Sequence, residues 1–327
     1  MHPADRPLHR RWLYALKPAS WPKLLVAAVL GQGIGIAGMG RIDPLGILVG
    51  FTFTLLHLSF VVLLNDWADR DVDAIKRRLY PEACSPKTIP DDVLDASSVL
   101  IGGVGAGVLA VGVAGVAEVV LDRPGLMLGG AGCVLLLVLY SLPPVRLNYR
   151  GGGEVLEMLG VGFFLPWWNA YVQGGEAMPA GLVVLPAFTL LCLASALASG
   201  LADEESDRLG GKRTFTTLFG PVAVRQAAEG LVVGAMLVWA ALPWLAPRYA
   251  QLWMVLPVVV VMVADYRELL SDGRSGGGGS DTMYRHYKLL LHQCIWRGGV
   301  MMAAMLSLAG LLGGGIGGLL GGGIGSG

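Results

Sequence analysis

Long apolar stretches alternate with short polar segments along nearly the whole chain. A helix that crosses the hydrocarbon core of a bilayer needs about 20 mostly apolar residues. Nine stretches approach or meet this length, and they lie near residues 22–40, 44–64, 97–119, 125–142, 154–173, 180–201, 222–245, 249–264 and 289–312. The pattern therefore predicts about nine transmembrane helices in one bundle.

These stretches show no alternation of apolar and polar residues of the kind that a transmembrane β-barrel requires. A helix also satisfies its backbone hydrogen bonds within one segment, as a lipid environment demands. Hydrophobic residues make up 54% of the chain and charged residues 15%, so the polar surface is too small to cover a soluble globule of this size. We expect an all-α, polytopic membrane protein with one transmembrane domain over residues 1–327.

Three segments depart from the bundle pattern. Residues 1–21 precede the first stretch and are expected to lie at the membrane interface on the cytoplasmic side. Residues 265–288 form a polar, Gly- and Ser-rich linker, and residues 313–327 form a Gly-rich tail that is poor helix material.

Two other patterns indicate packing rather than chemistry. The string Gly33-x-Gly35-x-x-Gly38 lies inside the first stretch and follows no strand, so it indicates close helix contact instead of a nucleotide site. The four cysteines form no CxxC pair, so we expect neither a disulfide framework nor a zinc site.

Lysines and arginines fall almost entirely on one side of the predicted bundle. Of the 24, 21 lie at the amino terminus or in loops on that side, and the other side holds only Arg41, Arg123 and Arg248. Because positive loops face the cytoplasm, we expect a multi-pass protein of a bacterial-type inner membrane with a cytoplasmic amino terminus. Asp and Glu also total 24, so the chain lacks the basic surface that nucleic-acid binding requires.

Two acidic clusters follow predicted helices on the positive side. Asp66, Asp69 and Asp73 come directly after the second stretch, and their spacing places them on one helical face. Asp203 and Asp207 come directly after the sixth stretch, one helical turn apart. Carboxylates crowded on one face repel each other unless a cation lies between them.

Mg²⁺ suits such clusters, because it takes oxygen ligands and is usually held by one or two carboxylates together with substrate phosphates. The two clusters therefore predict a Mg²⁺-bridged diphosphate at one membrane face, with an apolar tail between the helices.

The residues around the clusters resemble those of the UbiA superfamily of intramembrane prenyltransferases. The run Asn-Asp-x-x-Asp-x-x-x-Asp at 65–73 and the run Asp-x-x-x-Asp at 203–207 are similar to the paired motifs of that superfamily. The segment Tyr-Ser-Leu-Pro-Pro at 140–144 resembles its chlorophyll-synthase-like branch, and Ser-Pro-Lys-Thr-Ile-Pro at 85–90 resembles the basic segment that trails the first motif. The resemblance extends over nearly the whole chain.

This resemblance implies a role for each matching residue. The Mg²⁺ ligands would be Asn65, Asp66, Asp69, Asp73, Asp203 and Asp207. The diphosphate would be bound by Asn65, Lys76, Lys87, Arg146, Lys212 and Arg213. Tyr140 would orient or deprotonate the acceptor. One position departs from the branch: Asn148 stands where a lysine is usual, and Arg146 or Arg150 would supply the missing charge.

The implied activity is Mg²⁺-dependent transfer of a prenyl group from a polyprenyl diphosphate to a small aromatic acceptor, such as a hydroxybenzoate, homogentisate or naphthoate, on the way to a quinone-type product. Membrane lipid would surround the enzyme. Two alternatives share the fold: a terpene cyclase and an enzyme that transfers a sugar phosphate to a polyprenyl phosphate. A transporter is a remote alternative, because transport needs ionisable residues near the bilayer centre. Almost no acidic residue lies within a predicted span apart from Glu118 and Glu157, which are near span ends.

Overall fold

The computed structural model describes residues 3–81, 84–247, 249–272 and 280–321, and within this part of the chain the regular structure is entirely helical. The predicted all-α, polytopic fold is confirmed. The long helices are α2 (Pro22–Met39), α3 (Pro44–Ala68), α5 (Ala96–Val120), α6 (Leu126–Ser141), α9 (Leu185–Leu201), α12 (Pro221–Leu245), α13 (Leu252–Ser271) and α14 (Ser280–Gly321). A further rod consists of α7 (Gly153–Leu159), the π-helical turn η4 (Gly160–Phe164) and α8 (Leu165–Gly174).

Helices cover each of the nine stretches that the hydropathy pattern predicts. Among the described residues, six helices are both long enough and apolar enough to cross a membrane, and α6 is a shorter apolar helix. The chain is thus an integral, multi-pass membrane protein, and the exact number of nine spans stays a prediction.

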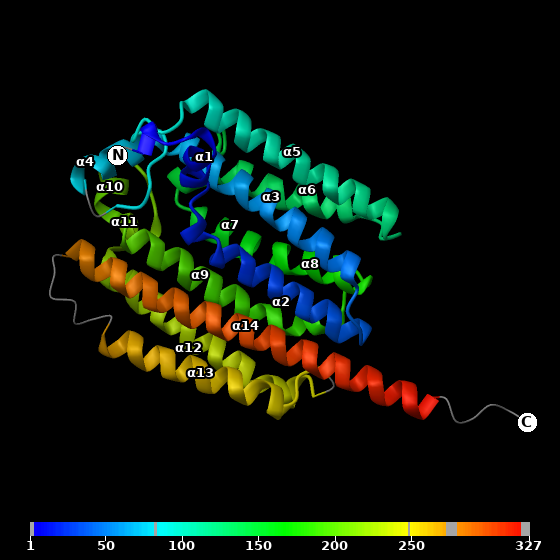
Figure 1. The fold of residues 1–327 in the computed structure, drawn as a ribbon. Helices are drawn as coiled ribbons and strands as arrows, with labels where there is room; N and C mark the ends of the chain where they lie inside the picture. Colours follow the sequence, from blue (N-terminus) through cyan, green and yellow to red (C-terminus); the bar gives the residue numbers. More distant parts are fainter. Residues whose placement is uncertain (1–2, 82–83, 248, 273–279, 322–327) are drawn as a thin grey trace, which may run out of the picture.

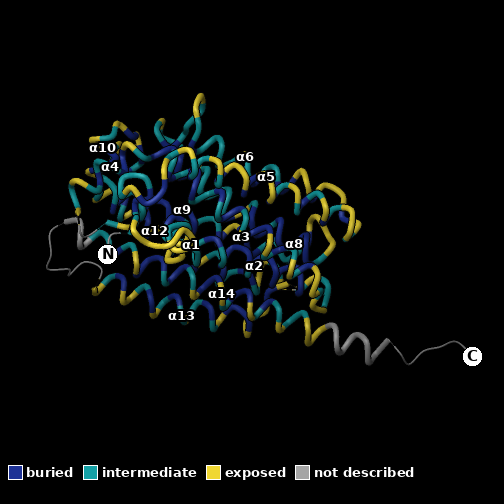
Figure 2. The backbone as a smooth tube through the Cα atoms, turned by 45° about the horizontal axis from the view of Figure 1, so that its top comes forward, coloured by how far each residue is buried: buried dark blue, intermediate teal, exposed yellow. Residues whose placement is uncertain are grey.

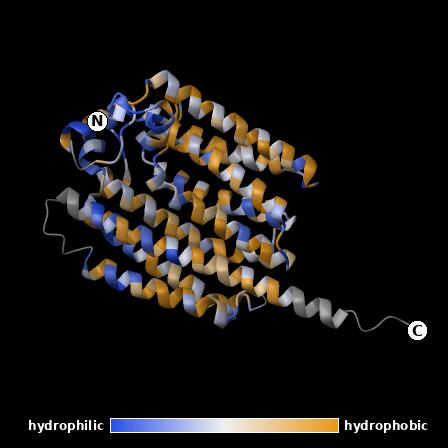
Figure 3. Ribbon diagram, viewed as in Figure 1, coloured by the Kyte–Doolittle hydropathy of each residue, from blue (hydrophilic) through white to orange (hydrophobic). Residues whose placement is uncertain are grey.

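The short helices gather at one end of the bundle, on the left in Figure 1. They are η1 (Pro3–Asp5), α1 (Leu8–Leu16), η2 (Pro18–Ser20), α4 (Arg70–Leu79), η3 (Leu147–Tyr149), α10 (Glu204–Leu209) and α11 (Phe215–Phe219), while η5 (Ala180–Val184) leads into α9. Figure 3 shows that hydrophilic residues concentrate at this end. The loops to which the sequence assigns most of the positive charge therefore lie together.

Helix α2 lies in the middle of the bundle, whereas α5 lies at its edge. In the most apolar 18-residue window of each helix, 61% of the residues of α2 are buried, against 28% in α5, and Figure 2 shows the same contrast. Glycines allow this central position. A Cβ at Gly33 would lie 2.7 Å from the carbonyl oxygen of Ala303, and one at Gly35 would lie 2.7 Å from that of Ala170. The predicted packing role of both glycines agrees with these contacts, whereas Gly38 faces open space.

Two segments differ from the sequence prediction. Helix α13 extends to Ser271 and α14 begins at Ser280. Both ends of the predicted linker 265–288 are therefore helical, and residues 273–279 of the linker lie outside the described part. Helix α14 continues to Gly321, because elongating an existing helix is far easier than starting one. The predicted tail 313–327 is thus helical up to Gly321, and residues 322–327 lie outside the described part.

Replacing Gly35 by Ala should destabilise the protein, because the new methyl group would overlap backbone atoms of α8 that cannot move aside. Overpacking of this kind costs about 1–3 kcal/mol. Gly38→Ala is the matched control on the same helix, where the space is open, and it should leave the thermal unfolding temperature in detergent unchanged or raised. Equal unfolding temperatures for the two variants would contradict this account of the packing.

Candidate diphosphate and metal site

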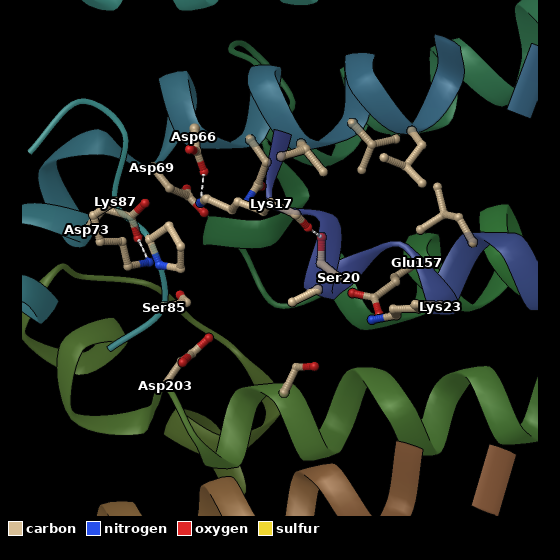
Figure 4. A pocket seen from close by; sticks show the side chains of 18 of the residues that line it. Lys17, Ser20, Lys23, Asp66, Asp69, Asp73, Ser85, Lys87, Glu157 and Asp203 are labelled. Atoms are coloured by element: carbon tan, nitrogen blue, oxygen red, sulfur yellow. Dashed lines mark hydrogen bonds and ion pairs between the residues drawn. The ribbon is translucent and has the colours of Figure 1, made fainter. Parts of the chain in front are cut away.

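One cavity of about 1140 Å³ opens among the helices at the end of the bundle where the short helices gather. Its wall includes Tyr140 and all six predicted metal ligands from the two acidic motifs, together with three of the predicted diphosphate cations: Asn65, Asp66, Asp69, Asp73, Asp203 and Asp207, and Lys76, Lys87 and Lys212. Figure 4 shows aspartates of the two motifs facing this cavity. Asp66 and Asp203 therefore share one site, although they lie 137 positions apart in the sequence.

The first motif lies where α3 passes into α4. The helical hydrogen-bond pattern continues across this junction, since the Asp69 amide donates to the Asn65 carbonyl at 2.9 Å and the Asp73 amide donates to the Asp69 carbonyl at 2.8 Å. The one-face spacing expected for Asp66, Asp69 and Asp73 is consequently retained, and all three line the cavity. The second motif lies where α9 passes into α10, and the Asp207 amide donates to the Asp203 carbonyl at 2.9 Å.

Every aspartate of the two motifs forms an ion pair with a lysine. Three pairs are Lys17–Asp66, Lys87–Asp73 and Lys76–Asp203. Lys212 forms the other two, with Nζ at 2.7 Å from Asp69 and 3.6 Å from Asp207. We call these five aspartates and four lysines the rim cluster. Like-charge repulsion within each motif is thus offset by lysines that come largely from other elements.

Lys212 connects the two motifs directly. Its side chain is 8% exposed and those of Asp69 and Asp207 are each 7% exposed. Burial alone would lower the pKa of Lys212, but the two carboxylates outweigh it and raise the pKa above its usual value. Burial and the neighbouring cations, Lys87 first among them, instead lower the pKa of Lys76 to about 7. Lys212 therefore keeps its charge firmly, while Lys76 releases its proton more readily than a solvated lysine does.

Asp69 receives further support from the segment after α6. The Tyr149 hydroxyl donates to Asp69 at 3.0 Å, and the Asn148 amide lies 3.5 Å from the same carboxylate. Among the described residues, the cation that pairs with Asp69 is Lys212 and not Arg146 or Arg150, the two that the sequence suggested. Arg146 instead donates to the Ala68 carbonyl at 2.8 Å and lies over the Tyr149 ring.

Two predicted diphosphate ligands lie away from the cavity wall. Arg146 is held by the contacts just described, and Arg213 is exposed; neither lines the cavity. For Arg146 this follows from local geometry, because the residue adopts a left-handed backbone conformation with φ 43° and its side chain turns toward α3.

Sequence reasoning missed Lys17, which pairs with Asp66. Lys17 ends α1 in the left-handed region, with φ 47°, a conformation that non-glycine residues seldom adopt. The resulting turn between α1 and η2 brings its side chain into the cavity wall. Thr88, whose hydroxyl donates to Asp66 at 2.7 Å, was also missed. The sequence offers only the dipeptide Lys-Pro before the first span as a signal.

Asp91 holds the segment that carries Lys87. It accepts two hydrogen bonds of 2.6 Å from the Arg77 guanidinium, one of 2.5 Å from the Tyr14 hydroxyl and one of 3.0 Å from the Lys87 amide. Burial would raise the pKa of Asp91, but the hydrogen bonds from Arg77 and Tyr14 outweigh it and hold the pKa below its usual range. Burial and Asp91 together raise the pKa of Tyr14 to about 12. Asp91 thus joins α1, α4 and the Lys87 segment.

Asn65 and the five aspartates offer metal-ligand atoms that fit Mg²⁺ by their chemistry. These atoms are all oxygens, which this ion prefers, and the side-chain oxygen of Asn65 is buried with no hydrogen-bond partner. In the described part of the chain, no three acidic, histidine or cysteine side chains converge as a ready-made metal site. Each of the five aspartates pairs with a lysine, so a divalent cation would have to take over the charge balance that the lysines provide.

Lys212→Met should destabilise the protein strongly, because it leaves two buried carboxylates without their counter-ion. Removing one partner of a buried ion pair costs about 3–5 kcal/mol. Arg208→Met is the matched control: Arg208 pairs with Glu204 but is 67% exposed, and an exposed pair contributes less than about 1 kcal/mol. Thermal unfolding in detergent measures both variants, and a similar loss in each would show that Lys212 does not tie the motifs together.

Comparisons with known proteins agree with this architecture. Residues 24–274 match the UbiA prenyltransferase family. The chain is 27% identical over 229 residues to chloroplastic chlorophyll synthase of Arabidopsis thaliana. The aligned region covers 68% of this chain but only 56% of that relative. It is 24% identical over 302 residues to 1,4-dihydroxy-2-naphthoate octaprenyltransferase of Mycobacterium leprae, covering 92% of this chain and 97% of that one.

Solved structures share the fold. A UbiA homolog from Archaeoglobus fulgidus, bound to DMAPP and Mg²⁺, superposes with a TM-score of 0.65 at 16% identity, covering 89% of this chain and 99% of that one. The apo UbiA homolog from Aeropyrum pernix gives a TM-score of 0.60 at 13% identity over 83% and 96% of the two chains. Because the family match covers more than half of this chain, the chain belongs to the UbiA prenyltransferase family.

Proposed function

We propose that this protein transfers a prenyl group from a polyprenyl diphosphate to a small aromatic acceptor within the membrane, with Mg²⁺ as cofactor. The observation that carries the proposal is the rim cluster, in which two acidic motifs and four lysines face one cavity between spanning helices. The similarity to the naphthoate octaprenyltransferase supports an aromatic acceptor.

The rim cluster supplies both kinds of ligand that a magnesium diphosphate needs. Asn65 and the five aspartates would hold the metal, and bound Mg²⁺ would neutralise negative charge on the departing diphosphate. Each aspartate that turns to a metal ion frees its lysine, so Lys76, Lys87 and Lys212 could then bind phosphate oxygens. Lys17 is placed to do the same. The ion pairs seen here would thus be exchanged for metal–carboxylate and lysine–phosphate contacts.

The remaining wall of the cavity suits an isoprenoid chain. It includes the apolar side chains of Leu58, Val61, Val62, Leu136 and Leu137. When the allylic carbon–oxygen bond breaks, its electron pair leaves with the diphosphate and an allylic cation remains. An electron-rich ring carbon of the acceptor then forms the new carbon–carbon bond, and the ring loses a proton. Apolar walls favour this outcome because they keep water away from the cation.

Tyr140 is the residue that we expect to orient the acceptor. It ends α6, lines the cavity, and interacts electrostatically with Asp69 and Lys212 of the rim cluster as well as with Glu157. Its place in the cavity wall beside these charged groups suits contact with an acceptor.

We also infer that residues 1–327 act as one domain in a bacterial-type inner membrane, with the rim cluster and the amino terminus on the cytoplasmic side, as the charge bias suggests.

Membranes or purified protein incubated with radiolabelled geranyl, farnesyl and longer prenyl diphosphates should label an aromatic acceptor only when Mg²⁺ is present. Asp69→Asn should reduce turnover about 100-fold or more, because it removes a carboxylate ligand of the metal that would stabilise the developing diphosphate charge. Asp122→Asn is the matched control: Asp122 is exposed and lies between α5 and α6, outside the cavity wall, and this variant should keep full activity. Turnover that survives chelation, or full activity of Asp69→Asn, would contradict the metal assignment, and a labelled cyclic terpene formed without acceptor would indicate a cyclase.

A further inference from the structure

A second cavity, of about 620 Å³, lies between α3, α5 and α6. Figure 1 shows these three helices side by side along one edge of the bundle. The residues that line this cavity are all apolar. Val104 and Val108 of its wall are 48% and 66% exposed, so the cavity opens toward the lipid around the bundle. We call it the lateral groove.

Helices α3 and α6 separate the lateral groove from the cavity that holds the rim cluster. On α3, the groove is lined by Phe60, Leu64 and Trp67, whose spacing places them on one helical face. Asp66 and Asp69 line the other cavity. Helix α6 is divided in the same way, with Val134 and Val138 on the groove side and Leu137 and Tyr140 on the other. The groove is therefore distinct from the proposed substrate site.

Two arginines lie at the end of the lateral groove that is near the rim cluster. Arg70 lies over the ring of Trp67, with its Cζ 4.9 Å from the ring centroid. The Arg146 amide donates to the carbonyl of Leu142, a groove residue, at 2.9 Å. The two guanidinium groups donate to carbonyls of successive residues, Trp67 and Ala68, each at 2.8 Å. Two positive charges thus lie close together where an apolar groove ends.

Capping of α3 explains part of this arrangement, because cations interact favourably with the last carbonyls of a helix. Capping neutralises neither charge, and no ion pair between described residues involves Arg70 or Arg146. Asp69, the neighbour of Arg70 in sequence, pairs with Lys212 instead. A guanidinium group has five N–H donors, and Nε of Arg146 is buried with no hydrogen-bond partner. Two adjacent guanidinium groups without a carboxylate favour a phosphate, which matches their planar fork of donors.

We propose that the lateral groove binds an anionic phospholipid, with an acyl chain in the groove and the phosphate on Arg70 and Arg146. Tryptophans such as Trp67 prefer the level of the lipid headgroups, and basic residues near that level attract anionic lipids. The charge favours a lipid over an apolar helix of another chain, because such a helix would leave both guanidinium groups unpaired. This inference does not depend on the proposed prenyl transfer, since it concerns the opposite face of α3 and α6.

Titration of the purified, delipidated protein with phosphatidylglycerol, and with phosphatidylcholine of the same acyl chains, tests the headgroup contact. We expect native mass spectrometry to show one tightly held phosphatidylglycerol. Arg70→Gln should weaken its binding about fivefold, a loss of about 1 kcal/mol for one arginine near an anionic headgroup, and should leave phosphatidylcholine binding unchanged. Arg70→Lys keeps the charge and should bind phosphatidylglycerol more tightly than Arg70→Gln. Arg78→Gln is the matched control, because Arg78 is an exposed cation of α4 outside both cavity walls.

Val108→Trp tests the acyl-chain contact, because the larger side chain fills the lateral groove. This variant should lose the retained phospholipid. Val116→Trp on the same helix is the matched control: Val116 is 64% exposed, close to the 66% of Val108, and lies outside the groove wall. Since both valines are exposed, both variants should unfold at the wild-type temperature in detergent without added phospholipid.

Four results would overturn the proposal. Equal affinity of the wild type for the two phospholipids, or unchanged phosphatidylglycerol binding in Arg70→Gln, would remove the headgroup contact. Unchanged lipid retention by Val108→Trp would remove the acyl-chain contact. A dimer that Val108→Trp dissociates would assign the groove to a second copy of the chain. Retention of a prenyl alcohol in preference to phosphatidylglycerol, lost in Val108→Trp, would assign the groove to an isoprenoid.

Discussion

The ion pairs of Lys212 with Asp69 and Asp207 hold the site together, because they join two acidic motifs that come from different halves of the chain. Five carboxylates could not share one largely buried region without counter-charges. The lysines of the rim cluster supply them, and Lys76 of α4, three residues after the first motif, pairs with Asp203 of the second in the same way. The lysines balance most of the negative charge, and the arrangement brings to the cavity the groups that we propose as ligands of a metal ion and a diphosphate.

The helical bundle makes this arrangement possible by leaving a cavity beside closely packed helices. Gly33 and Gly35 bring α2 against its neighbours with no room for a side chain, so the helices pack closely here. At the end of the bundle, the packing is replaced by polar contacts: Asp91 joins α1, α4 and the Lys87 segment. The apolar part of the cavity wall and a rim of ion pairs suit a reaction in which a charged headgroup is exchanged while its chain stays in an apolar environment.

Two differences between prediction and structure have the same cause. Arg146 lies in a segment whose motif suggested a diphosphate ligand, but its left-handed backbone directs it to the Ala68 carbonyl. Lys17 has no motif of its own to predict its role, yet a left-handed turn at the end of α1 brings it to Asp66. The direction of a long cationic side chain depends on the backbone conformation at one residue, which a spacing rule does not contain.

The sequence by itself determined the membrane environment, the helical class, the approximate position of every long helix and the identity of the two acidic motifs, because hydropathy and helical spacing are local properties of the chain. Only the tertiary structure decided that Asp66 and Asp203 face one cavity and that each aspartate has a lysine partner. These features depend on contacts between residues up to 143 positions apart, from Asp69 to Lys212, and such contacts exist only once the helices have packed.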